Sequence, residues 1–274
     1  MRDIFDVRDK IVLVTGGLGQ IGIEFVKEFH GRGARVAVAS RRADADALAA
    51  AVGTEDVGRL LAVAIDITSK ESVEHGLDAI EARWGEAPDV LINNAGIDTQ
   101  PSAPPEVSGP FEDFPIDVFR EVVDVNLVGT FIMTQAVGKR MRADDKPGSI
   151  INVGSIYGVV SPVQDIYAYK KEQTGIPFIK PVAYSAAKSG IYNLTRYCAT
   201  YWGRHGIRVN TLTPSGVWRD TQDETFQANY TSRIPIGRMA QADEYNGAVI
   251  FLASDASRYM TGSNLTVDGG WTAW

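Results

Sequence analysis

Short, almost wholly apolar runs recur along the chain, and each one ends at a turn or a polar segment. Runs of this kind are typical of parallel strands that are covered on both faces. Seven of them stand out, at residues 11–14, 36–39, 60–65, 90–92, 149–153, 207–212 and 264–267. The sequence therefore predicts a mainly parallel, seven-stranded sheet.

Between these runs, apolar residues recur at the spacing of an amphipathic helix. The predicted helices cover residues 19–31, 69–84, 117–141, 184–202 and 244–252, the second of them with Ser69 as its N-cap. Strands and helices alternate without a linker or a repeat, which is the pattern of a doubly wound α/β sheet with helices on both faces. We expect a single domain over residues 1–274.

Composition narrows the class of partner. The chain has 274 residues, 45% of them hydrophobic, and a formal net charge of −7 at pH 7. Nucleic acids and anionic membranes require a basic surface, so a small-molecule partner is expected instead. No apolar run reaches the roughly 18 residues of a membrane span, and the charged opening is unlike a signal peptide. With one cysteine, Cys198, expected in the core, the sequence predicts a cytoplasmic protein.

A glycine cluster follows the first predicted strand directly. Thr15-Gly16-Gly17-Leu18-Gly19-Gln20-Ile21-Gly22 connects that strand to a helix. A strand, a glycine turn and a helix form the first half of a βαβ unit, in which backbone N–H groups at the helix start bind a pyrophosphate. An isolated glycine cluster is often only a tight turn, but the flanking strand and helix favour a dinucleotide site.

The end of the second strand bears on which dinucleotide binds. A carboxylate there would accept the ribose 2′-hydroxyl of NAD and repel the 2′-phosphate of NADP. This chain has Ser40 and Arg41 instead, and an arginine can hold a phosphate with two hydrogen bonds. The sequence favours NADP(H) and leaves NAD(H) open, the alternative being that Arg41 and Arg42 are simply solvated.

Tyr184 and Lys188 are one helical turn apart on the same face of a predicted helix. An ammonium group beside a phenol lowers the phenol's pKa from about 10 toward neutrality, which makes the pair an acid/base device. A second pair, Tyr167 and Lys171, competes for this role. Tyr184 is favoured because it heads an apolar-periodic helix, whereas Gly175 and the prolines after it break any helix that begins at Tyr167.

Taken in order, these motifs resemble the classical short-chain dehydrogenase/reductase family. The resemblance rests on the glycine cluster, Asn93-Asn94-Ala95-Gly96, Asn126, Gly154-Ser155, Tyr184 with Lys188, and Val267-Asp268-Gly269-Gly270. It implies a Rossmann-type fold and an NAD(P)-dependent oxidoreductase. Two positions depart from the family pattern, because Gln20 replaces the middle glycine of the cluster and Ser215 replaces the glycine after Pro214.

The same resemblance implies roles for individual residues. Tyr184 exchanges a proton with the substrate oxygen, Ser155 orients that oxygen, and Lys188 lowers the phenol's pKa and holds the nicotinamide ribose. Asn126 kinks its helix and completes a proton route to solvent. The implied cofactor contacts are Gly16, Gly19, Gln20, Ile21, Ser40, Arg41, Asp66, Ile67, Asn94, Ala95, Gly96, Tyr184, Lys188, Pro214 and Val217.

The segment between Ser155 and Tyr184 is longer than in typical family members. We expect residues 156–183 to form an insertion near the active site, the alternatives being a surface loop or a subunit contact. An aperiodic segment at 218–236 fits a mobile lid. The expected substrate contacts are Ser155, Gln164, Tyr167, Phe178 and Trp218.

The expected reaction interconverts an alcohol and a ketone or aldehyde on a polar, carbohydrate-like molecule. The opening Asp3-Ile4-Phe5 resembles gluconate 5-dehydrogenases, and the ending Trp271-Thr272-Ala273-Trp274 resembles members of surface-sugar biosynthesis. A 3-ketoacyl-thioester reductase is the alternative within this reaction class, and a nucleotide-sensing protein without turnover is the alternative outside it.

No metal is expected, because His30, His75 and His205 have no ligand spacing and are expected to be exposed. The resemblance implies a homotetramer, or else a homodimer, in which the helices at 117–141 and 184–202 pair between subunits. The apolar ending at 271–274 is expected to be packed at a subunit interface.

Overall fold

The computed structural model describes residues 3–274, and its strands form one sheet. The strands are β1 Ile11–Thr15, β2 Arg35–Ser40, β3 Leu60–Ala64, β4 Val90–Asn93, β5 Gly148–Val153, β6 Ile207–Pro214 and β7 Asn264–Val267. They lie in the order β3-β2-β1-β4-β5-β6-β7, and all neighbouring pairs are parallel. The expected seven-stranded Rossmann-type sheet is confirmed. Its strand order reverses between β1 and β4, which is where such sheets bind dinucleotides.

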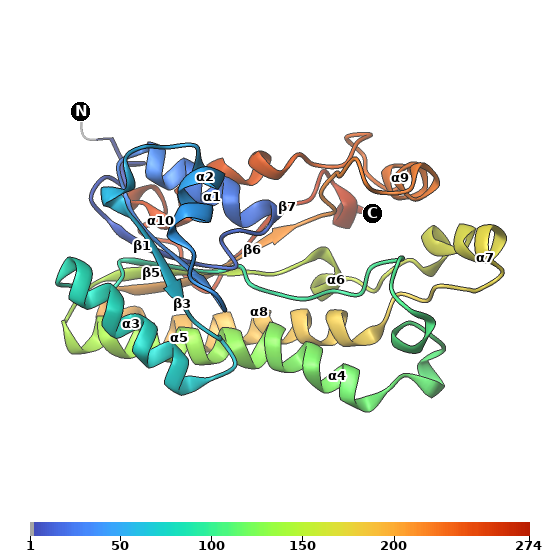
Figure 1. The fold of residues 1–274 in the computed structure, drawn as a ribbon, viewed down its shortest axis with the longest axis horizontal. Coiled ribbons are helices and arrows are strands. Elements are labelled where there is room, and N and C mark those ends of the chain that lie inside the picture. The colour runs from blue at the N-terminus through green and yellow to red at the C-terminus, as the bar shows by residue number, and fades with distance from the viewer. Residues whose placement is uncertain (1–2) are drawn as a thin grey trace.

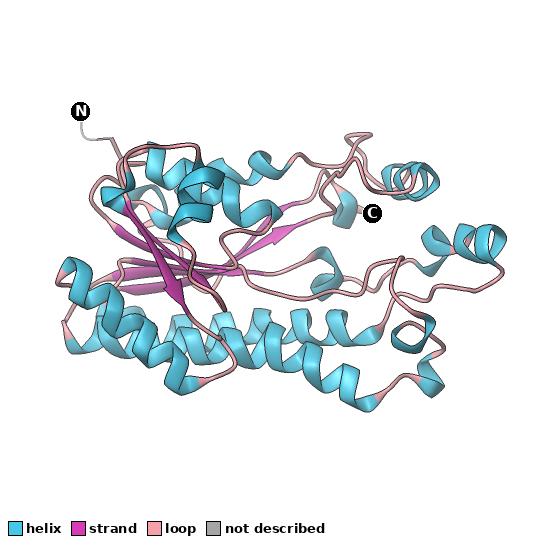
Figure 2. Cartoon of the chain, in the orientation of Figure 1, coloured by secondary structure: helices cyan, strands magenta, loops and turns pink. Residues whose placement is uncertain are grey.

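Helices cover the sheet in two layers. The α-helices of the described chain, including those outside the two layers, are α1 Gln20–Gly31, α2 Ala45–Val52, α3 Lys70–Trp84, α4 Ile116–Val123, α5 Gly129–Ala143, α6 Ile156–Val159, α7 Tyr169–Thr174, α8 Val182–Trp202, α9 Glu224–Thr231 and α10 Asn246–Ala253. In Figure 1, α1, α2 and α10 lie over one face of the sheet, and α3, α5 and α8 lie over the other. Figure 2 shows the strands between these two helical layers.

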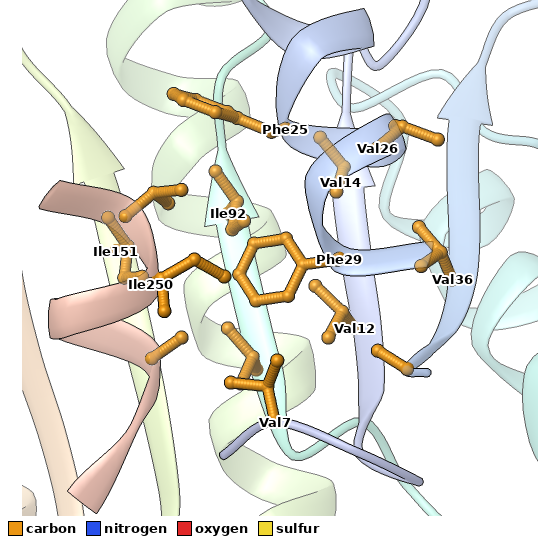
Figure 3. Packing of buried hydrophobic residues seen from close by; sticks show 14 of the residues in the cluster. Val7, Val12, Val14, Phe25, Val26, Phe29, Val36, Ile92, Ile151 and Ile250 are labelled. Atoms are coloured by element: carbon orange, nitrogen blue, oxygen red, sulfur yellow. The ribbon is translucent and has the colours of Figure 1, made fainter. Parts of the chain in front are cut away.

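Each layer has its own apolar core. On the α1 side, the ring of Phe29 lies among Val12, Ile92 and Ile250 (Figure 3). Phe25 points toward the same core from one helical turn earlier, as the spacing along α1 predicts. A second cluster fills the α3, α5 and α8 side. Because both faces of the sheet are covered, the strands need apolar side chains at nearly every position, which explains their continuous hydrophobicity.

A third apolar cluster lies outside these two layers. It joins the segment 156–183 to the region of α9 and to the C-terminus, through Ile156, Tyr157, Ile166, Tyr167, Phe178, Tyr230, Ile234, Met239 and Trp271. The rings of Tyr230 and Trp271 stack with their centroids 4.4 Å apart. Trp271 is 5% exposed and packs within its own chain, so the expected packing of the ending is confirmed for this residue, while Trp274 is 79% exposed.

The helix expected at residues 117–141 is not regular along its length. A π-helical turn, Asp124–Val128, separates α4 from α5, and Asn126 sits at the centre of that turn with its side chain fully buried. π-helical turns of this kind often mark functional positions. The kink expected at Asn126 therefore takes the form of a local widening of the helix.

Several other local features differ from the expectation. α2 was not expected and is set by its caps, with the Asp44 carboxylate accepting from the Ala47 N–H and Gly53 ending it at φ 72°. α9 lies inside the segment expected to be an aperiodic lid, and Asp223 caps it. His30 is 6% exposed rather than solvated, because its ring bonds the Asp56 carbonyl at 3.0 Å. The expected Ser69 cap and the burial of Cys198 are confirmed.

Candidate active site

A cavity of about 1230 Å³ lies at the carboxyl ends of the strands. Its wall takes residues from the turns after β1, β2, β3, β4, β5 and β6 and from the segment 156–183. The carboxyl edge near the reversal of strand order is the dinucleotide-binding position in open α/β sheets. All the residues that the sequence suggested as cofactor contacts line this cavity.

The glycine turn is shaped for the close approach of a ligand to the backbone. Gly16 has a φ of 61°, and a Cβ at Gly22 would stand 2.3 Å from the Gly16 carbonyl oxygen. The Asn94 amide holds the turn in place by donating to the carbonyl oxygens of Thr15, at 3.2 Å, and of Gly16, at 3.0 Å. No side chain caps the start of α1, so the first N–H groups of that helix remain available. These features fit the pyrophosphate of a dinucleotide.

Gln20 replaces the family's middle glycine, and the structure shows where its amide goes. Its Nε2 donates to the Trp218 carbonyl at 2.8 Å, and its Oε1 accepts from the guanidinium of Arg219. The substitution therefore ties the segment after β6 to the start of α1, at the edge of the cavity. Trp218 does not line the cavity and is 41% exposed, whereas Arg219 lines it.

Three side chains mark the end of the cavity at β2 and β3. Ser40 donates its hydroxyl to the Arg42 carbonyl, and Arg41 is exposed at the cavity wall. Asp66 accepts from the Thr68 N–H at 2.9 Å and from its hydroxyl at 2.7 Å, and these bonds, with a smaller effect of Arg41, lower the pKa of that carboxyl. At this end of the cavity, Arg41 is exposed, and the position at the end of β2 is a serine, Ser40, rather than an acidic residue.

Tyr184, Lys188 and Ser155 come together in the wall of the cavity. α8 begins after Pro181, which suits an N-terminal helix position because it has no N–H to leave unpaired. Tyr184 and Ser155 both line the cavity, and the Ser155 hydroxyl is close enough to lower the pKa of Tyr184. The Lys188 ammonium donates to the Val153 carbonyl at 2.7 Å and lies 5.8 Å from the centroid of the Tyr184 ring.

The backbone of Ser155 is held in place by a second tyrosine on α8. The Tyr192 hydroxyl donates to the Ser155 carbonyl at 2.8 Å and lies 3.3 Å from the Ser155 N–H, which donates to it. The same hydroxyl lies 2.7 Å from that of Thr213 on β6. Because this tyrosine bridges two strands, the Ser155 hydroxyl is presented from a fixed backbone.

The pKa of Tyr184 moves in the direction opposite to that expected from the sequence. Burial raises it, the charge of Asp98 raises it further, and only the hydrogen bond from Ser155 lowers it. Burial lowers the pKa of Lys188 to about 8, so the amine is already neutral at the pH where the phenol would ionise, and its charge does not lower the phenol's pKa. The phenol is therefore protonated at neutral pH.

Asn126 lies behind this group, outside the cavity lining. Its Oδ1 accepts from the Ile97 N–H and its Nδ2 donates to the Ile97 carbonyl, both at 2.8 Å. A Cβ on Gly96 would stand 2.8 Å from Asn126 Oδ1 and 3.8 Å from the Lys188 ammonium. Asn126 thus fixes the loop after β4 close to Lys188, and both ends of its amide are used for that purpose.

Among the described residues, the cation–ring contacts are at Tyr169 and Tyr184 and not at the competing Tyr167. The Tyr167 hydroxyl is paired with that of Tyr157 at 3.3 Å, burial raises the pKa of Tyr167, and Lys171 is exposed. Tyr167 does line the cavity, whereas Gln164 and Phe178 do not. Gln164 uses its amide on the backbone of Lys180, accepting at 2.9 Å and donating at 3.1 Å.

Two charged residues that the sequence interpretation did not single out also line the cavity. Lys180, beside the start of α8, donates to Asp98 Oδ2 at 2.6 Å, and Asp98 follows β4 in the loop that Asn126 holds. They are 82 positions apart in the chain. No local sequence pattern indicates that they pair. The only signal in the sequence is that each of the two segments, the loop after β4 and the segment before α8, carries a charged residue.

The described part of the chain, residues 3–274, contains no group of three or more His, Cys, Asp or Glu side chains placed to hold a metal ion. Among the same residues, no helix is both long enough and apolar enough to cross a membrane.

Known proteins were compared with the whole chain. A family model described as Enoyl-(Acyl carrier protein) reductase matches residues 18–272. The D-threitol dehydrogenase of Mycolicibacterium smegmatis is 34% identical over 98% of this chain and 95% of its own length.

Solved structures agree with the sequence comparison. A short chain dehydrogenase from Leptospira borgpetersenii with bound NAD⁺ superposes with a TM-score of 0.84 at 35% identity, covering 99% of this chain and 96% of that one. A gluconate 5-dehydrogenase from Burkholderia cenocepacia, in complex with NADP and tartrate, has a TM-score of 0.82 at 31% identity and covers 99% and 98%.

These matches extend over nearly the full length of the chain. NAD and NADP are each bound by one of the similar structures. The chain belongs to the classical short-chain dehydrogenase/reductase family and is a short-chain NAD(P)-dependent dehydrogenase.

Proposed function

We propose that this dehydrogenase interconverts an alcohol and a ketone or aldehyde on a polar, carbohydrate-like small molecule, with Tyr184 as the general acid/base. The observation that carries the proposal is that Tyr184 and Ser155 lie together in the cavity wall, with Lys188 one helical turn from Tyr184. A substrate oxygen placed between the two hydroxyls can accept from both, which fixes its position.

The proton moves through this chain's own groups. A nicotinamide cofactor supplies or accepts the hydride when it is bound. Because the pKa of Tyr184 is raised, the phenol holds a proton at neutral pH and can give it to the oxygen of a carbonyl as that oxygen gains charge. In the opposite direction the phenol must first lose its proton, so alcohol oxidation needs a more alkaline solution than carbonyl reduction does.

The proposed cofactor is NADP(H), with NAD(H) as the alternative. Support comes from Ser40, where an NAD-specific site has a carboxylate, and from the exposed guanidinium of Arg41 at the same end of the cavity. A guanidinium can hold the 2′-phosphate of NADP with two charge-assisted hydrogen bonds.

The proposed substrate class follows from the similar proteins and from the polar cavity wall. The names of two of them give threitol and gluconate as the substrates of those proteins. In this chain, Asp98, Lys180 and Gln222 add charged and amide groups to the cavity. Such a wall suits a hydroxylated molecule better than the acyl chain of a 3-ketoacyl thioester, which would leave these groups without partners.

The test is a substrate panel. The full-length protein is incubated with NADP⁺ or NAD⁺ and with polyols, sugars and sugar acids, or with NADPH or NADH and a 3-ketoacyl thioester. Turnover is followed by the absorbance of the reduced nicotinamide. Oxidation of a polyol or sugar compound supports the proposal. Turnover confined to the thioester would instead support the reductase alternative, and nucleotide binding without any turnover would support a sensing role.

We also propose a cytoplasmic homotetramer, with a homodimer as the alternative, that pairs subunits through the outer faces of α5 and α8. Tyr197 and Tyr201 on α8 stack on each other with centroids 6.0 Å apart and are 65% and 66% exposed. Phe131 on α5, 45% exposed, lines the same hollow of about 760 Å³. Large exposed rings gathered on one face are typical of protein contacts.

A further inference from the structure

The cavity wall beside Tyr184 contains an ion pair that the proposed proton transfer does not use. The Lys180 ammonium donates to Asp98 Oδ2 at 2.6 Å and to the Thr99 carbonyl at 2.9 Å. The side chain of Lys180 is 4% exposed and that of Asp98 is 27% exposed, yet both residues line the cavity. The ammonium lies 5.5 Å from the centroid of the Tyr184 ring. The pair therefore stands beside the proposed acid/base group.

This ion pair has hydrogen-bonding capacity left over. Asp98 Oδ1 is buried and has no partner. An ammonium group carries three N–H donors, of which Asp98 and Thr99 take two. The pair can therefore give one acceptor and one donor to a ligand. Because buried polar groups without partners are unfavourable, a ligand that engages both is stabilised there.

Both members of the pair stand on fixed backbone. The amide of Gln164 bonds both the N–H and the carbonyl of Lys180. Asp98 follows Ile97, whose N–H and carbonyl are both bonded by Asn126. A recognition group must be held rigidly if it is to discriminate between substrates, and two side-chain amides provide that rigidity here.

We propose that Asp98 and Lys180 form a subsite for a second hydroxyl of the substrate, next to the carbon that reacts, and so select vicinal diols and polyols. A hydroxyl is both a donor and an acceptor, which matches the free Asp98 oxygen and the remaining Lys180 N–H. Oδ1 is covered in this structure, so the carboxylate turns about its Cβ–Cγ bond, a torsion with broad minima, to present that oxygen, and the bond from Lys180 shifts with it. The inference rests on the proposed function, because it assumes that Tyr184 receives the first hydroxyl.

Charge argues against a carboxylate as the occupant. Asp98 balances the ammonium of Lys180, so the pair as a whole gives an anion no net attraction, and the unpaired oxygen of Asp98 would repel it. An alkyl group would leave the donor and the acceptor unsatisfied. A neutral hydroxyl is the group that fits both.

The test compares butane-2,3-diol with butan-2-ol, which differ by one hydroxyl on the neighbouring carbon. The full-length enzyme, Asp98→Asn and the double variant Asp98→Asn with Lys180→Met are assayed with the preferred cofactor. The control is Glu106→Gln, which removes a carboxylate from the exposed part of the same loop, outside the cavity. The measured quantity is the ratio of kcat/KM for the diol to that for the mono-alcohol.

We expect the ratio to be at least about tenfold in the wild type and in the control, and to fall about tenfold or more in both variants, as the loss of a hydrogen bond to a charged group predicts. The double variant removes both charges, so the test survives if the single variant does not fold. A ratio unchanged in the variants overturns the subsite while leaving the proposed function intact. Selective loss of activity on a hydroxy acid such as gluconate, with the diol ratio kept, also overturns it. Failure of the wild type to oxidise either alcohol, while it oxidises a polyol or sugar of the panel, overturns the subsite and leaves the proposed function intact.

Discussion

The side-chain amide of Asn126 bonds both polar groups of the Ile97 backbone, accepting from its N–H and donating to its carbonyl at 2.8 Å each. Asn126 lies in the π-helical turn between α4 and α5, and Ile97 lies in the loop after β4. One side chain therefore joins a helix in the outer layer to the loop that carries Asp98.

We predict that Asn126→Ala lowers the free energy of unfolding by about 2–4 kcal/mol, because two backbone groups lose their partner. The variant should also lose activity, since the loop beside Lys188 is no longer held. Urea unfolding and the kcat on the best panel substrate measure the two effects. Glu55→Ala, at an exposed position between α2 and β3, is the control and should change stability by less than about 0.5 kcal/mol.

Replacing each of the two candidate tyrosines by phenylalanine tests which of them is the acid/base group. Tyr184→Phe should lower kcat by about 10²–10⁴-fold, because it removes the proposed acid/base hydroxyl beside Ser155 and Lys188. Tyr167→Phe removes only a hydroxyl paired with Tyr157 and should keep most of the activity. Steady-state kinetics on both variants measure the two kcat values. A larger loss of kcat in Tyr167→Phe than in Tyr184→Phe would assign the acid/base role to Tyr167.

Removing the exposed guanidinium tests the cofactor preference. Arg41→Ala should weaken NADPH binding about 10–100-fold and leave NADH binding nearly unchanged, because only NADPH has a 2′-phosphate to pair with Arg41. Fluorescence titration of each reduced cofactor into the wild type and the variant measures this. The neighbouring Arg42→Ala is the matched control. Equal NADPH affinity in wild type and Arg41→Ala would remove the argument for NADP(H).

The buried amine of Lys188 makes stability depend on pH in a definite direction. Its pKa is lowered from 10.5 to about 8 in the folded protein, so between these values the unfolded chain binds more protons than the folded one. The free energy of unfolding of the wild type, relative to Lys188→Met, should therefore rise as the pH is raised through this window. From about pH 7 to about pH 9.5 the gain should be about 2 kcal/mol. Urea unfolding of both proteins at the two pH values measures it, and a flat difference would show that the amine keeps its ordinary pKa.

Charging the exposed rings on α8 tests the assembly. The double variant Tyr197→Glu with Tyr201→Glu should dissociate into smaller species, because like charges would face each other across the proposed contact. Tyr259→Glu, at a fully exposed position elsewhere, should keep the wild-type mass. Light scattering after size exclusion gives the masses. A wild-type protein that is already monomeric would contradict the proposed tetramer.

The sheet and the cofactor cavity could be predicted from sequence because their signals are local. Each strand is an apolar run, and its polar loop follows directly in the chain, so a parallel sheet must gather those loops at one edge. Tyr184 and Lys188 are likewise neighbours on one helix, and their relative placement follows from helical spacing.

What the sequence did not reveal depends on contacts between distant segments. The pKa of Tyr184 is raised by burial and by the charge of Asp98. Neither effect can be deduced from the spacing of residues along the helix. Gln164 and Trp218 were expected at the substrate, but the amide of Gln164 is used on Lys180, and the Trp218 side chain is turned out of the cavity lining. His30 was expected in solvent, but a carbonyl from another loop covers it.

One aromatic cluster joins the segment 156–183, α9 and Trp271. It limits which parts of this protein can be exchanged with those of a relative. Tyr167 stacks against Phe226, and Tyr230 against Trp271, so three stretches far apart in the chain share one set of packed rings. Transplanting any one stretch into a shorter relative would strip it of the surfaces that it packs against. A chimera that is to change substrate preference therefore has to carry all three stretches together.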